Sequence, residues 1–548
     1  MVNDNKLTLP DLFSEAVSRH GKRSALAFVG EKPRTYEQVN SEVRALMAYM
    51  ERMGVVPGDR VAILSANMPN WGITYLAVTS MGAIAVPLLP DFHPNEITNI
   101  LNHSESRVLF VSRGLVNKIE PEHYPHLEKV IRIEDFTTYT SQDKTPEFQQ
   151  GAEPAHRYEP REQDTASIIY TSGTTGKSKG VMLSHRNIAF NATKVLTIQN
   201  IKPDDRLLSI LPLSHTYENT LGFVTPIMRG ACIYYLSKPP SPAILLPALK
   251  KVRPTVMLSV PMIIEKIYRT RVLPGITGKW YLKALYQVPA FRKKLHQAAG
   301  KKLMATFGGR LRFFGIGGAK LDPQVEKFLR EARFPYAIGY GLTETSPLLA
   351  GTNPSNTRLE STGPAMEGVE LKIHQPDPVT GEGEIWARGD NVMKGYYKDP
   401  EQTSKVLTSD GWFKTGDLGV FGNDQFLFIK GRLKNMIVGE NGENIYPEEI
   451  ESVINNFKHV VESIVVREKG KLVAMVHFNR DEIFQKYHDF KEEVHQYAET
   501  RIEELRKELR EYINARVNRF SRVQYVNVRN EPFEKTATHK IKRYLYNR

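Results

Sequence analysis

The chain has very little cysteine: Cys232 is the single one among 548 residues. One cysteine cannot form an internal disulfide, so a disulfide framework is excluded and a reducing, cytoplasmic location is expected. Cys232 lies in the apolar run ACIYYL. A small packed side chain is therefore a better interpretation of this residue than a nucleophile.

A long uninterrupted apolar stretch is also missing. The N-terminal residues show no basic segment followed by an apolar core, so no secretory signal is visible. Residues 71–90 carry no charge, but they include hydroxyl side chains, Gly82 and Pro87. A turn at Gly82 would divide them into two apolar blocks that are too short to span a bilayer. The sequence therefore predicts a helix, a short strand and a soluble protein.

Acidic residues are absent from one segment, 268–302, which carries nine lysines and arginines among aromatic and aliphatic side chains. Such a segment can lie on an anionic membrane, where each cation contributes about 1 kcal/mol near the surface. A solvated basic helix on the protein surface is the alternative interpretation. Nucleic-acid binding is disfavoured, because no recognised binding motif accompanies the net charge of +13.

The overall composition is that of a globular protein, with 41% hydrophobic and 25% charged residues. The length suggests two or more domains. Up to about residue 430, helical and extended patterns alternate, which predicts an α/β fold with largely parallel sheets. Helices are expected at 12–19 and 36–53, and strands at 60–64, 83–88 and 107–111.

The pattern changes near Gly431, so we divide the chain into a large domain, 1–430, and a small mobile α+β domain, 431–548. The elements expected in the small domain are a helix at 450–454 and strands at 460–466 and 472–478. A long amphipathic segment follows, whose apolar stripe could pair with a second copy as a coiled coil. Packing against the domain's own sheet is the commoner arrangement. A monomer and a homodimer are both compatible with this pattern.

The richest local pattern is YTSGTTGKSKGVMLSH, from Tyr170 to His185. Its glycines permit close backbone approach, and its hydroxyls and lysines supply donors to an anion. A Walker loop would need glycine where Thr171 stands. A flexible linker is disfavoured, because the apolar runs 168–170 and 181–183 look like strands that would hold the loop rigid. The sequence therefore predicts a binding loop for a polyphosphate.

Five further segments follow this loop. They are LPLSHTYE (211–218), GYGLTETS (339–346), WFKTGDLG (412–419), GRLKNMIVGENGENIYPEEIE (431–451) and KTATHKIKR (535–543). Together with the loop they resemble the adenylate-forming enzymes, which include acyl-CoA synthetases, luciferases and peptide-synthetase adenylation domains. The resemblance extends from about Thr35 to the C-terminus and is closest to bacterial long-chain fatty acid CoA ligases. It implies ATP and Mg²⁺ as cofactors and CoA as a co-substrate.

The resemblance implies a nucleotide site with defined roles. Tyr340 would stack on adenine, while Asp417 and Arg432 would bind the ribose. Glu344 and Thr171 would hold the magnesium ion. The full set of implied nucleotide and cofactor contacts is Thr171, Ser172, Gly173, Thr174, Thr175, Gly176, Lys179, Gly317, Gly318, Ala319, Tyr340, Gly341, Thr343, Asp417, Arg432, Lys434, Gly439 and Gly442.

The implied catalytic residues are Lys540, His215, Thr343 and Glu344. Lys540, on the small domain, would bridge the attacking carboxylate and the α-phosphate and then leave when that domain turns. Lys535 and Lys542 are basic competitors for this role. His215 would lie near the substrate carboxylate and the entry path of the thiol. It is not expected to bind a metal, because no Cys/His cluster surrounds it.

The chain departs from the family pattern at three positions. Ser178 stands where proline is usual in the phosphate loop, and His539 replaces glycine in the lysine motif. Gly431 replaces the aspartate that usually precedes Arg432, which leaves Lys434 as another candidate for the pivot between the domains.

The segment 439–451 resembles the loop that guides the pantetheine thiol of CoA to the acyl-adenylate. The sequence therefore predicts an ATP-dependent acyl-CoA ligase that acts through acyl-AMP and releases pyrophosphate. A long-chain fatty acid is the favoured substrate. The alternatives are an aromatic or medium-chain acid, transfer to a carrier-protein phosphopantetheine, and a nucleotide-binding scaffold without catalysis.

Overall fold

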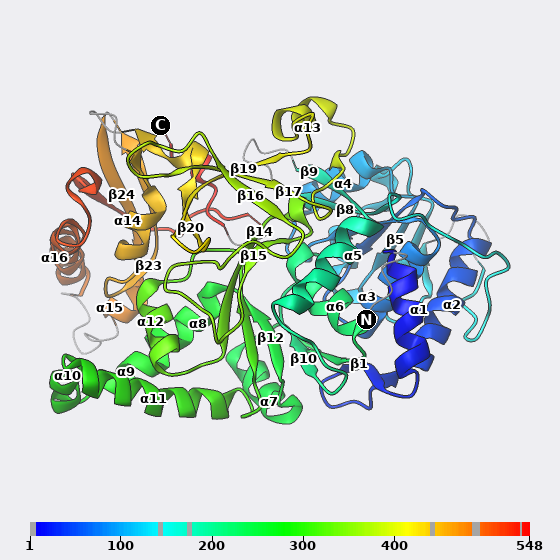
Figure 1. Ribbon diagram of the computed structural model, residues 1–548, viewed down its shortest axis with the longest axis horizontal. Helices are drawn as coiled ribbons and strands as arrows, with labels where there is room; N and C mark the ends of the chain where they lie inside the picture. Colours follow the sequence, from blue (N-terminus) through cyan, green and yellow to red (C-terminus); the bar gives the residue numbers. More distant parts are fainter. Residues whose placement is uncertain are drawn as a thin grey trace.

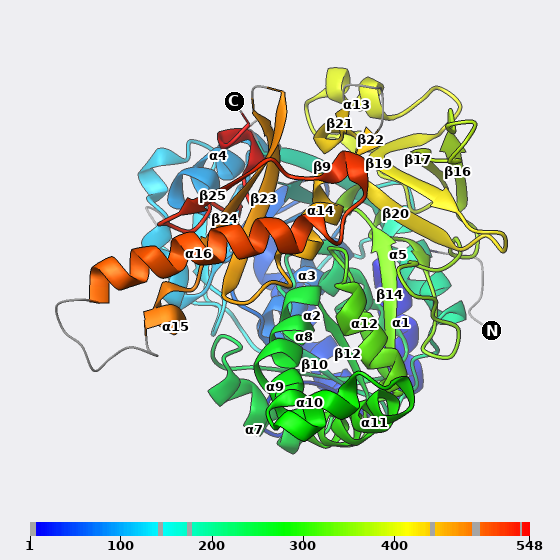
Figure 2. The same ribbon diagram turned by 90° about the vertical axis from the view of Figure 1, so that its left-hand side faces the viewer.

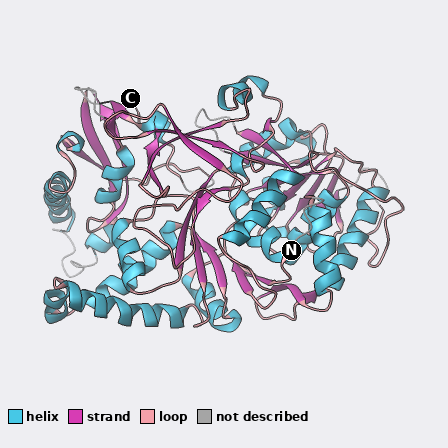
Figure 3. Cartoon of the chain, in the orientation of Figure 1, coloured by secondary structure: helices cyan, strands magenta, loops and turns pink. Residues whose placement is uncertain are grey.

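The structure is a computed structural model that describes residues 7–140, 146–171, 178–438, 444–468, 470–484, 494–536 and 540–547. Side chains are described for the same residues except 140, 484 and 494–499. Two large sheets with their helices form the body, and a smaller C-terminal unit lies beside it, at the left of Figure 1. Figure 3 shows helices and strands mixed throughout the body.

Each large sheet has eight strands, and the inner strand pairs of both sheets are parallel. The first sheet runs, in spatial order, β18 (Gly395–Tyr396), β9 (Lys179–Ser184), β8 (Thr165–Thr171), β4 (Ile84–Leu88), β3 (Arg60–Leu64), β5 (Val108–Val111), β6 (Lys129–Arg132) and β7 (Thr138–Thr140). The second runs β15 (Leu348–Gly351), β14 (Tyr336–Gly341), β13 (Phe313–Ile316), β12 (Val256–Ser259), β10 (Arg206–Ser209), β11 (Cys232–Tyr235), β1 (Ser24–Phe28) and β2 (Arg34–Thr35). Antiparallel pairs such as β8 with β9 and β14 with β15 occur toward the edges.

Several helices of the body begin at a residue whose side chain caps the first turn. At α2, the Thr35 side chain accepts from the Gln38 amide while the Gln38 side chain returns to the Thr35 backbone, which satisfies two donors of the first turn. The helices are α1 (Leu9–His20), α2 (Tyr36–Arg52), α3 (Pro69–Ser80), α4 (Pro94–Ser104), α5 (His185–Lys194), α6 (Thr225–Met228), α7 (Pro242–Val252), α8 (Pro261–Ile267), α9 (Leu273–Thr277), α10 (Trp280–Tyr286), α11 (Pro289–Thr306), α12 (Pro323–Glu331) and α13 (Pro400–Val406). Two π-helical segments, η4 (Tyr217–Val224) and η5 (Tyr268–Val272), precede α6 and α9.

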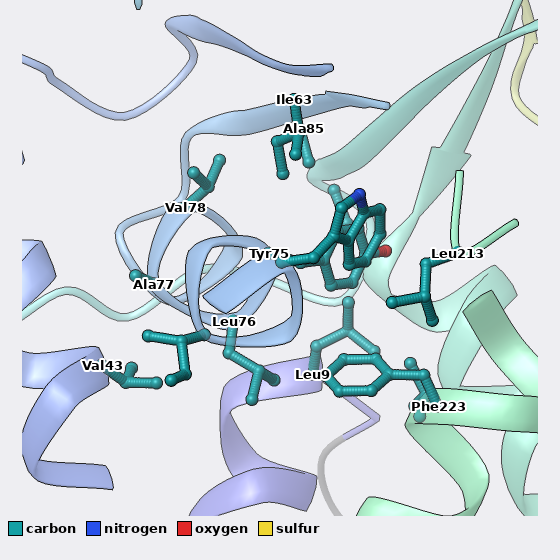
Figure 4. Close-up of a cluster of buried hydrophobic side chains, with 14 of the residues drawn as sticks. Leu9, Val43, Ile63, Tyr75, Leu76, Ala77, Val78, Ala85, Leu213 and Phe223 are labelled. Atoms are coloured by element: carbon teal, nitrogen blue, oxygen red, sulfur yellow. The ribbon is translucent and has the colours of Figure 1, made fainter. Parts of the chain in front are cut away.

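Helix α3 explains the uncharged stretch of the sequence. All of its residues are buried, and it contacts β1 of one large sheet and β3 and β4 of the other. Apolar side chains from both sheets and from α3 form one core, part of which is drawn in Figure 4. Gly82 adopts a φ of 70° in the turn between α3 and β4, so the predicted helix, turn and strand are confirmed. Among the helices that the structure describes, none is long and apolar enough to cross a membrane.

A four-stranded antiparallel sheet follows the second large sheet in the chain. Its strands, in spatial order, are β16 (Glu370–His374), β17 (Gly383–Arg388), β19 (Phe413–Phe421) and β20 (Leu427–Arg432). The alternating pattern of the sequence did not reveal this sheet. Strand β20 ends at Arg432, close to the boundary expected at 430, and the division of the chain into two domains stays a prediction.

The C-terminal unit is built on three strands, β23 (Val460–Glu468), β24 (Lys471–Phe478) and β25 (Tyr525–Arg529). A short hairpin, β21 (Ile437–Val438) with β22 (Asn444–Ile445), precedes helix α14 (Pro447–Ile454), and α15 (Arg480–Phe484) and α16 (Val494–Asn514) follow β24. Figure 2 shows α16 lying across this sheet. The apolar stripe of α16, Ile502, Leu505, Leu509 and Ile513, is buried in the unit's own core. This part of the amphipathic segment therefore packs within the chain. The first apolar positions of the stripe expected from the sequence, Tyr487 and Phe490, lie outside the described residues.

Candidate active site

Residues expected at a nucleotide site meet where the second large sheet, the antiparallel sheet and the C-terminal tail approach one another. Tyr340 lies near the end of β14. Asp417 in β19 stands opposite Arg432 at the end of β20 in the strand register. Antiparallel pairing thus brings together two residues that the sequence separates by a hairpin. The motifs that contain Asp417 and Arg432 lie close together in the chain because they are on the two strands of one hairpin.

Asp417 is the centre of this group and is only 4% exposed. The Tyr340 hydroxyl donates to Asp417 Oδ2 at 2.8 Å, and Arg432 Nε lies 2.8 Å from Oδ1. Burial raises the pKa of Asp417, and the Arg432 guanidinium opposes that shift. Because each carboxylate oxygen can accept more than one hydrogen bond, the pair retains capacity for a diol ligand. The hydrogen bond also fixes the position of the Tyr340 hydroxyl.

Lys540 reaches this group from the C-terminal tail. Its backbone is held by Thr536, whose amide donates to the Lys540 carbonyl at 2.8 Å. Solvent reaches the Lys540 side chain, yet the surrounding protein and the Arg432 charge lower its pKa. The carboxylates of Asp417 and Glu344 oppose this shift. Lys540 is therefore close enough to interact electrostatically with residues of the body.

The two competing lysines of the tail lie in different surroundings. Lys535 forms an ion pair with Glu462 in β23. Lys542 lies 4.0 Å from Glu534, a neighbour in the tail. The structure thus directs Lys540 toward the candidate nucleotide residues and pairs its neighbours with carboxylates of the C-terminal unit. His539 lies outside the described residues.

His215 lies on the segment between β10 and the π-helix η4. Its Nδ1 accepts from the Tyr217 amide at 3.2 Å. This leaves the proton of the neutral ring on Nε2. Burial lowers the pKa of His215 to about 4, and the Lys540 charge adds to the shift. His215 is therefore neutral near pH 7, and it lies within electrostatic range of Lys540.

Gly317, Gly318 and Ala319 belong to the segment GIGGAKL, residues 315–321, which forms the end of β13 and the turn that follows. Gly318 adopts a φ of 88°, a conformation that favours glycine. The Tyr217 ring packs against Gly317, where an added Cβ would lie 3.2 Å from a ring carbon. Ala319 is exposed directly after this turn. Gly317 therefore allows the Tyr217 ring to lie close against the backbone.

The phosphate loop is presented by a β-hairpin, as the flanking apolar runs predicted. Thr171, at the end of β8, pairs with Lys179, at the start of β9. Lys179 Nζ lies 3.2 Å from Gln402 Oε1 and 4.8 Å from the centre of the Tyr396 ring. The intervening candidates Ser172, Gly173, Thr174, Thr175 and Gly176 lie outside the described residues. The strand, loop and strand arrangement differs from the strand, loop and helix of a Walker site.

Glu344 and Thr343 occupy a short turn, η6 (Thr343–Thr345), directly after β14. The Tyr396 hydroxyl donates to Glu344 Oε1 at 3.0 Å. Two buried amides hold the turn itself, because Asn191 and Asn391 both donate to the Thr345 carbonyl, at 3.2 and 3.1 Å. Gly341 permits this geometry: an added Cβ would lie 1.8 Å from the carbonyl oxygen of Pro347.

A magnesium ion would find few protein ligands here. Within the described ranges, no group of three or more His, Cys, Asp or Glu side chains is placed to hold a metal. Magnesium commonly uses one or two carboxylates together with substrate phosphates and water. Glu344, with the Thr171 hydroxyl at the mouth of the phosphate loop, fits that manner of binding. The residues present are therefore compatible with a metal that arrives with a nucleotide.

The residues packed at the junction of the two units explain why glycine is favoured at position 431. A Cβ on Gly431 would lie 3.0 Å from Glu448 Oε2 and 3.3 Å from the Tyr446 ring. An aspartate would therefore bring a second carboxylate against Glu448. Lys434 follows in the chain, and its pKa is lowered by the surrounding protein and by the Arg432 charge. Gly439 and Gly442 lie outside the described residues.

Several residues of the site escaped the sequence analysis. Tyr396 contacts Glu344 from β18, which pairs with β9, and Gln402 contacts Lys179 from helix α13. Asn191 and Asn391 support the η6 turn from helix α5 and from a loop. Tyrosines and amides of this kind are common in any chain. A signal for their roles arises only from the pairing of distant strands.

Comparisons with known proteins identify the family of this chain. Residues 13–397 match the family described as AMP-binding enzyme. Because this match covers more than half of the chain, the protein belongs to the AMP-binding enzyme family. The family expected from the motifs is therefore confirmed.

The relatives with curated names include several acyl-CoA synthetases. Long-chain-fatty-acid–CoA ligase FadD15 of Mycobacterium bovis is 30% identical over 471 residues, which cover 79% of this chain and 75% of the relative. Long chain acyl-CoA synthetase 7, peroxisomal, of Arabidopsis thaliana is 29% identical over 523 residues, 86% of this chain and 73% of the relative. Putative acyl-CoA synthetase YngI of Bacillus subtilis is 28% identical over 497 residues, 84% of each chain.

Solved structures show the same fold. The o-succinylbenzoate CoA synthetase MenE of Bacillus subtilis, in complex with its acyl-adenylate, matches with a TM-score of 0.75 at 23% identity over 98% of both chains. ATP-bound MatB of Rhodopseudomonas palustris matches with a TM-score of 0.76 at 24% identity over 98% of both chains. The predicted α/β fold class is therefore confirmed.

Proposed function

We propose that this protein is an ATP-dependent acyl-CoA ligase that forms acyl-AMP, releases pyrophosphate and transfers the acyl group to CoA. One observation carries the proposal most strongly. The C-terminal unit delivers Lys540 to a group in which Tyr340 and Arg432 hold a buried Asp417. A cation supplied by one unit to a polar group on another suits a reaction between two anions, the carboxylate and the nucleotide.

In the first step a carboxylate oxygen of the acid attacks the α-phosphorus of ATP, and the bond to the β-phosphate oxygen breaks to release pyrophosphate. Lys540 would neutralise the charge shared by the attacking and transferred groups, and Thr343 would hold an α-phosphate oxygen. Asp417 and Arg432 would orient the ribose. A magnesium ion held by Glu344 and Thr171 together with the phosphates would offset charge on the leaving pyrophosphate.

In the second step the thiol sulfur of CoA attacks the acyl carbonyl carbon, the bond to the AMP phosphate oxygen breaks, and the thiol proton is released. His215 is neutral near pH 7 and carries its proton on Nε2. It can therefore donate a hydrogen bond to a carbonyl oxygen without adding a positive charge. The segment that contains Gly439 and Gly442 would guide the pantetheine arm.

A long-chain fatty acid is the substrate that we favour. The support comes from the names of relatives that share about 30% identity over most of this chain, such as FadD15. The likeness to MenE and MatB structures shows only that one fold accepts different acids. Acetate, benzoate, octanoate and oleate should therefore be compared as substrates in the presence of ATP and Mg²⁺.

The test measures both half-reactions with the full chain. Pyrophosphate release should require a carboxylic acid and be fastest with oleate, and thioester should form when CoA is added. Preference for a short or aromatic acid would refute the long-chain assignment. Acid-dependent pyrophosphate release without a CoA thioester would indicate transfer to another thiol, and no release with any acid would favour the scaffold alternative.

Lys540→Ala tests the central role directly. Adenylation should fall by about a hundredfold or more, as expected when a charged group aimed at the transition state is lost. Thioester formation from supplied acyl-AMP should be largely kept. Lys542→Ala is the matched control, because it removes a neighbouring charge that lies near Glu534. Equal loss in both half-reactions would reject the role of Lys540.

We also propose that the basic segment 268–302 rests on an anionic membrane, which is where a long-chain acid would be found. Its helices α9, α10 and α11 run along the lower edge of the molecule in Figure 1. Trp280 is 84% exposed, and Phe291 is exposed on α11. The exposed lysines around them include Lys279, Lys283, Lys293 and Lys294. Exposed aromatic side chains among cations match the chemistry of a bilayer surface.

A cytoplasmic location and the oligomeric state stay predictions.

Sedimentation of the full chain with vesicles tests this surface. Binding should be stronger to vesicles that contain phosphatidylglycerol than to pure phosphatidylcholine, and Lys293→Glu with Lys294→Glu should weaken it. Lys22→Glu with Lys32→Glu is the control, because it changes the net charge equally at exposed sites elsewhere. Equal binding to both vesicle types, or equal loss in the control, would contradict the proposal.

A further inference from the structure

A second contact joins the C-terminal unit to the body. Arg269, in the π-helix η5, donates from Nη1 to the backbone carbonyl of Asn455 at 2.6 Å. Its Nη2 lies 3.3 Å from Asn456 Oδ1. Asn455 ends helix α14 of the C-terminal unit. One guanidinium of the body thus contacts two consecutive residues of the unit that carries Lys540.

Arg269 is held in place by the body itself. Its Nη2 lies 3.1 Å from Asp322 Oδ2, and Asp322 is 4% exposed. Asp322 is fixed in turn, because it caps helix α12 and its amide donates to Glu265 Oε1 at 2.9 Å. The guanidinium is therefore oriented before the C-terminal unit arrives. A planar side chain with its donors already directed loses little freedom when the contact forms.

The partner on the C-terminal unit suits a cation. The carbonyl of Asn455 lies at the C-terminal end of α14, where unpaired carbonyls and the helix dipole favour positive charge. Asn455 Oδ1 also accepts from Ser463 Oγ in β23 at 2.9 Å. The contact with Arg269 is thereby connected to the sheet of the C-terminal unit.

The same strand β23 holds the tail that carries Lys540. Glu462 Oε1 accepts from the Phe533 amide at 2.7 Å, and its other oxygen pairs with Lys535. Lys535 forms a β-bridge with Ile541, the residue after Lys540. A continuous set of contacts therefore leads from Arg269 through Asn455 and β23 to the loop of Lys540.

We propose that Arg269 is a positioning residue for adenylation, which holds the C-terminal unit in the orientation that keeps Lys540 beside Asp417 and Glu344. The inference rests on the proposed function, because it assigns Arg269 to the first half-reaction. Arg269 does not act on the nucleotide itself. Its loss should therefore lower the rate of adenylation without weakening the binding of ATP.

The test compares Arg269→Ala with wild-type protein in both half-reactions. Acid-dependent exchange between ATP and pyrophosphate should show a kcat lower by about tenfold or more, because both contacts are lost and one hydrogen bond to a charged group alone accounts for about tenfold. The KM for ATP should be unchanged, and thioester formation from supplied acyl-AMP should be kept. Arg269→Lys should restore part of the rate. Arg271→Ala, at an exposed arginine of the same π-helix, should match wild type.

Asn456→Ala tests the same contact from the C-terminal unit and should produce a smaller loss of the same kind. Asn456→Ala also tests the role of this contact in adenylation if Arg269→Ala does not fold. Equal loss in both half-reactions, a raised KM for ATP, or an Arg271→Ala protein as slow as Arg269→Ala would overturn the inference. Absence of exchange in the wild-type protein would instead refute the proposed function.

Discussion

Glu218 lies on the π-helix that begins two residues after His215, and its carboxyl group is placed where charge is costly. Its side chain is 2% exposed. Ser209 Oγ lies 2.6 Å from Oε1, while Oε2 is buried without a hydrogen-bond partner among the described residues. Burial raises the pKa of Glu218 from 4.5 to about 8. We therefore expect a protonated, neutral side chain at pH 7.

The sign of the resulting pH dependence follows from proton linkage. Between pH 4.5 and 8 the folded protein keeps a proton on Glu218 that the unfolded chain releases, so stability falls as pH rises through this interval. The difference between the two pKa values, about 3.5 units, corresponds to roughly 5 kcal/mol at 1.36 kcal/mol per unit. Above pH 8 Glu218 is ionised in the folded protein too, and the stability lost since pH 4.5 reaches its full value.

Glu218→Gln should remove this dependence, because an amide has the shape of the protonated acid but does not titrate. The midpoint of denaturant unfolding, followed at pH 5, 7 and 9, should be similar for both proteins at pH 5 and higher for the variant at pH 9. Glu37→Gln, at an exposed position of α2, is the control and should follow wild type. Parallel pH profiles of wild type and Glu218→Gln would refute the reasoning.

Three further predictions concern the site. Gly341→Ala should abolish adenylation and lower stability, because its Cβ would meet the Pro347 carbonyl at 1.8 Å; pyrophosphate release and thermal unfolding would show this. Tyr340→Phe removes the donor to Asp417 and should weaken ATP binding by about tenfold, measured by calorimetry. His215 has a pKa lowered by burial to about 4, so its contribution to stability should be complete above pH 6.5 and lost as pH falls toward 4. His215→Gln should reduce that acid sensitivity in unfolding experiments.

The parts of the fold that could be predicted depend on local patterns. The apolar runs around Tyr170 and Val181 form the strands β8 and β9 that present the phosphate loop, because alternating or continuous apolar residues reveal a buried strand. The uncharged stretch with Gly82 forms a helix, a turn and a strand for the same reason. Asp417 and Lys540 could be proposed as site residues because the short motifs that contain them resemble those of the adenylate-forming enzymes.

The contacts that could not be predicted arise from pairing between distant segments. Tyr396 reaches Glu344 because the two-residue strand β18 joins the edge of β9, and so short a strand has no periodic pattern. Arg269 belongs to a basic segment in which every arginine looks alike in sequence. The structure distinguishes it by its neighbours Asp322 and Asn455. The three-dimensional contacts of such a residue, and not its type, distinguish it from other residues of the same type in the chain.

Helix α3 has a consequence for any attempt to divide this protein. It has no face toward water, since helices α1 and α2 and strands of both large sheets pack against it. Producing either sheet as a separate polypeptide would uncover apolar side chains along the helix and favour aggregation. Protease cuts that leave a folded body are therefore expected after Arg432, and complementation from two halves should fail when the break separates the sheets.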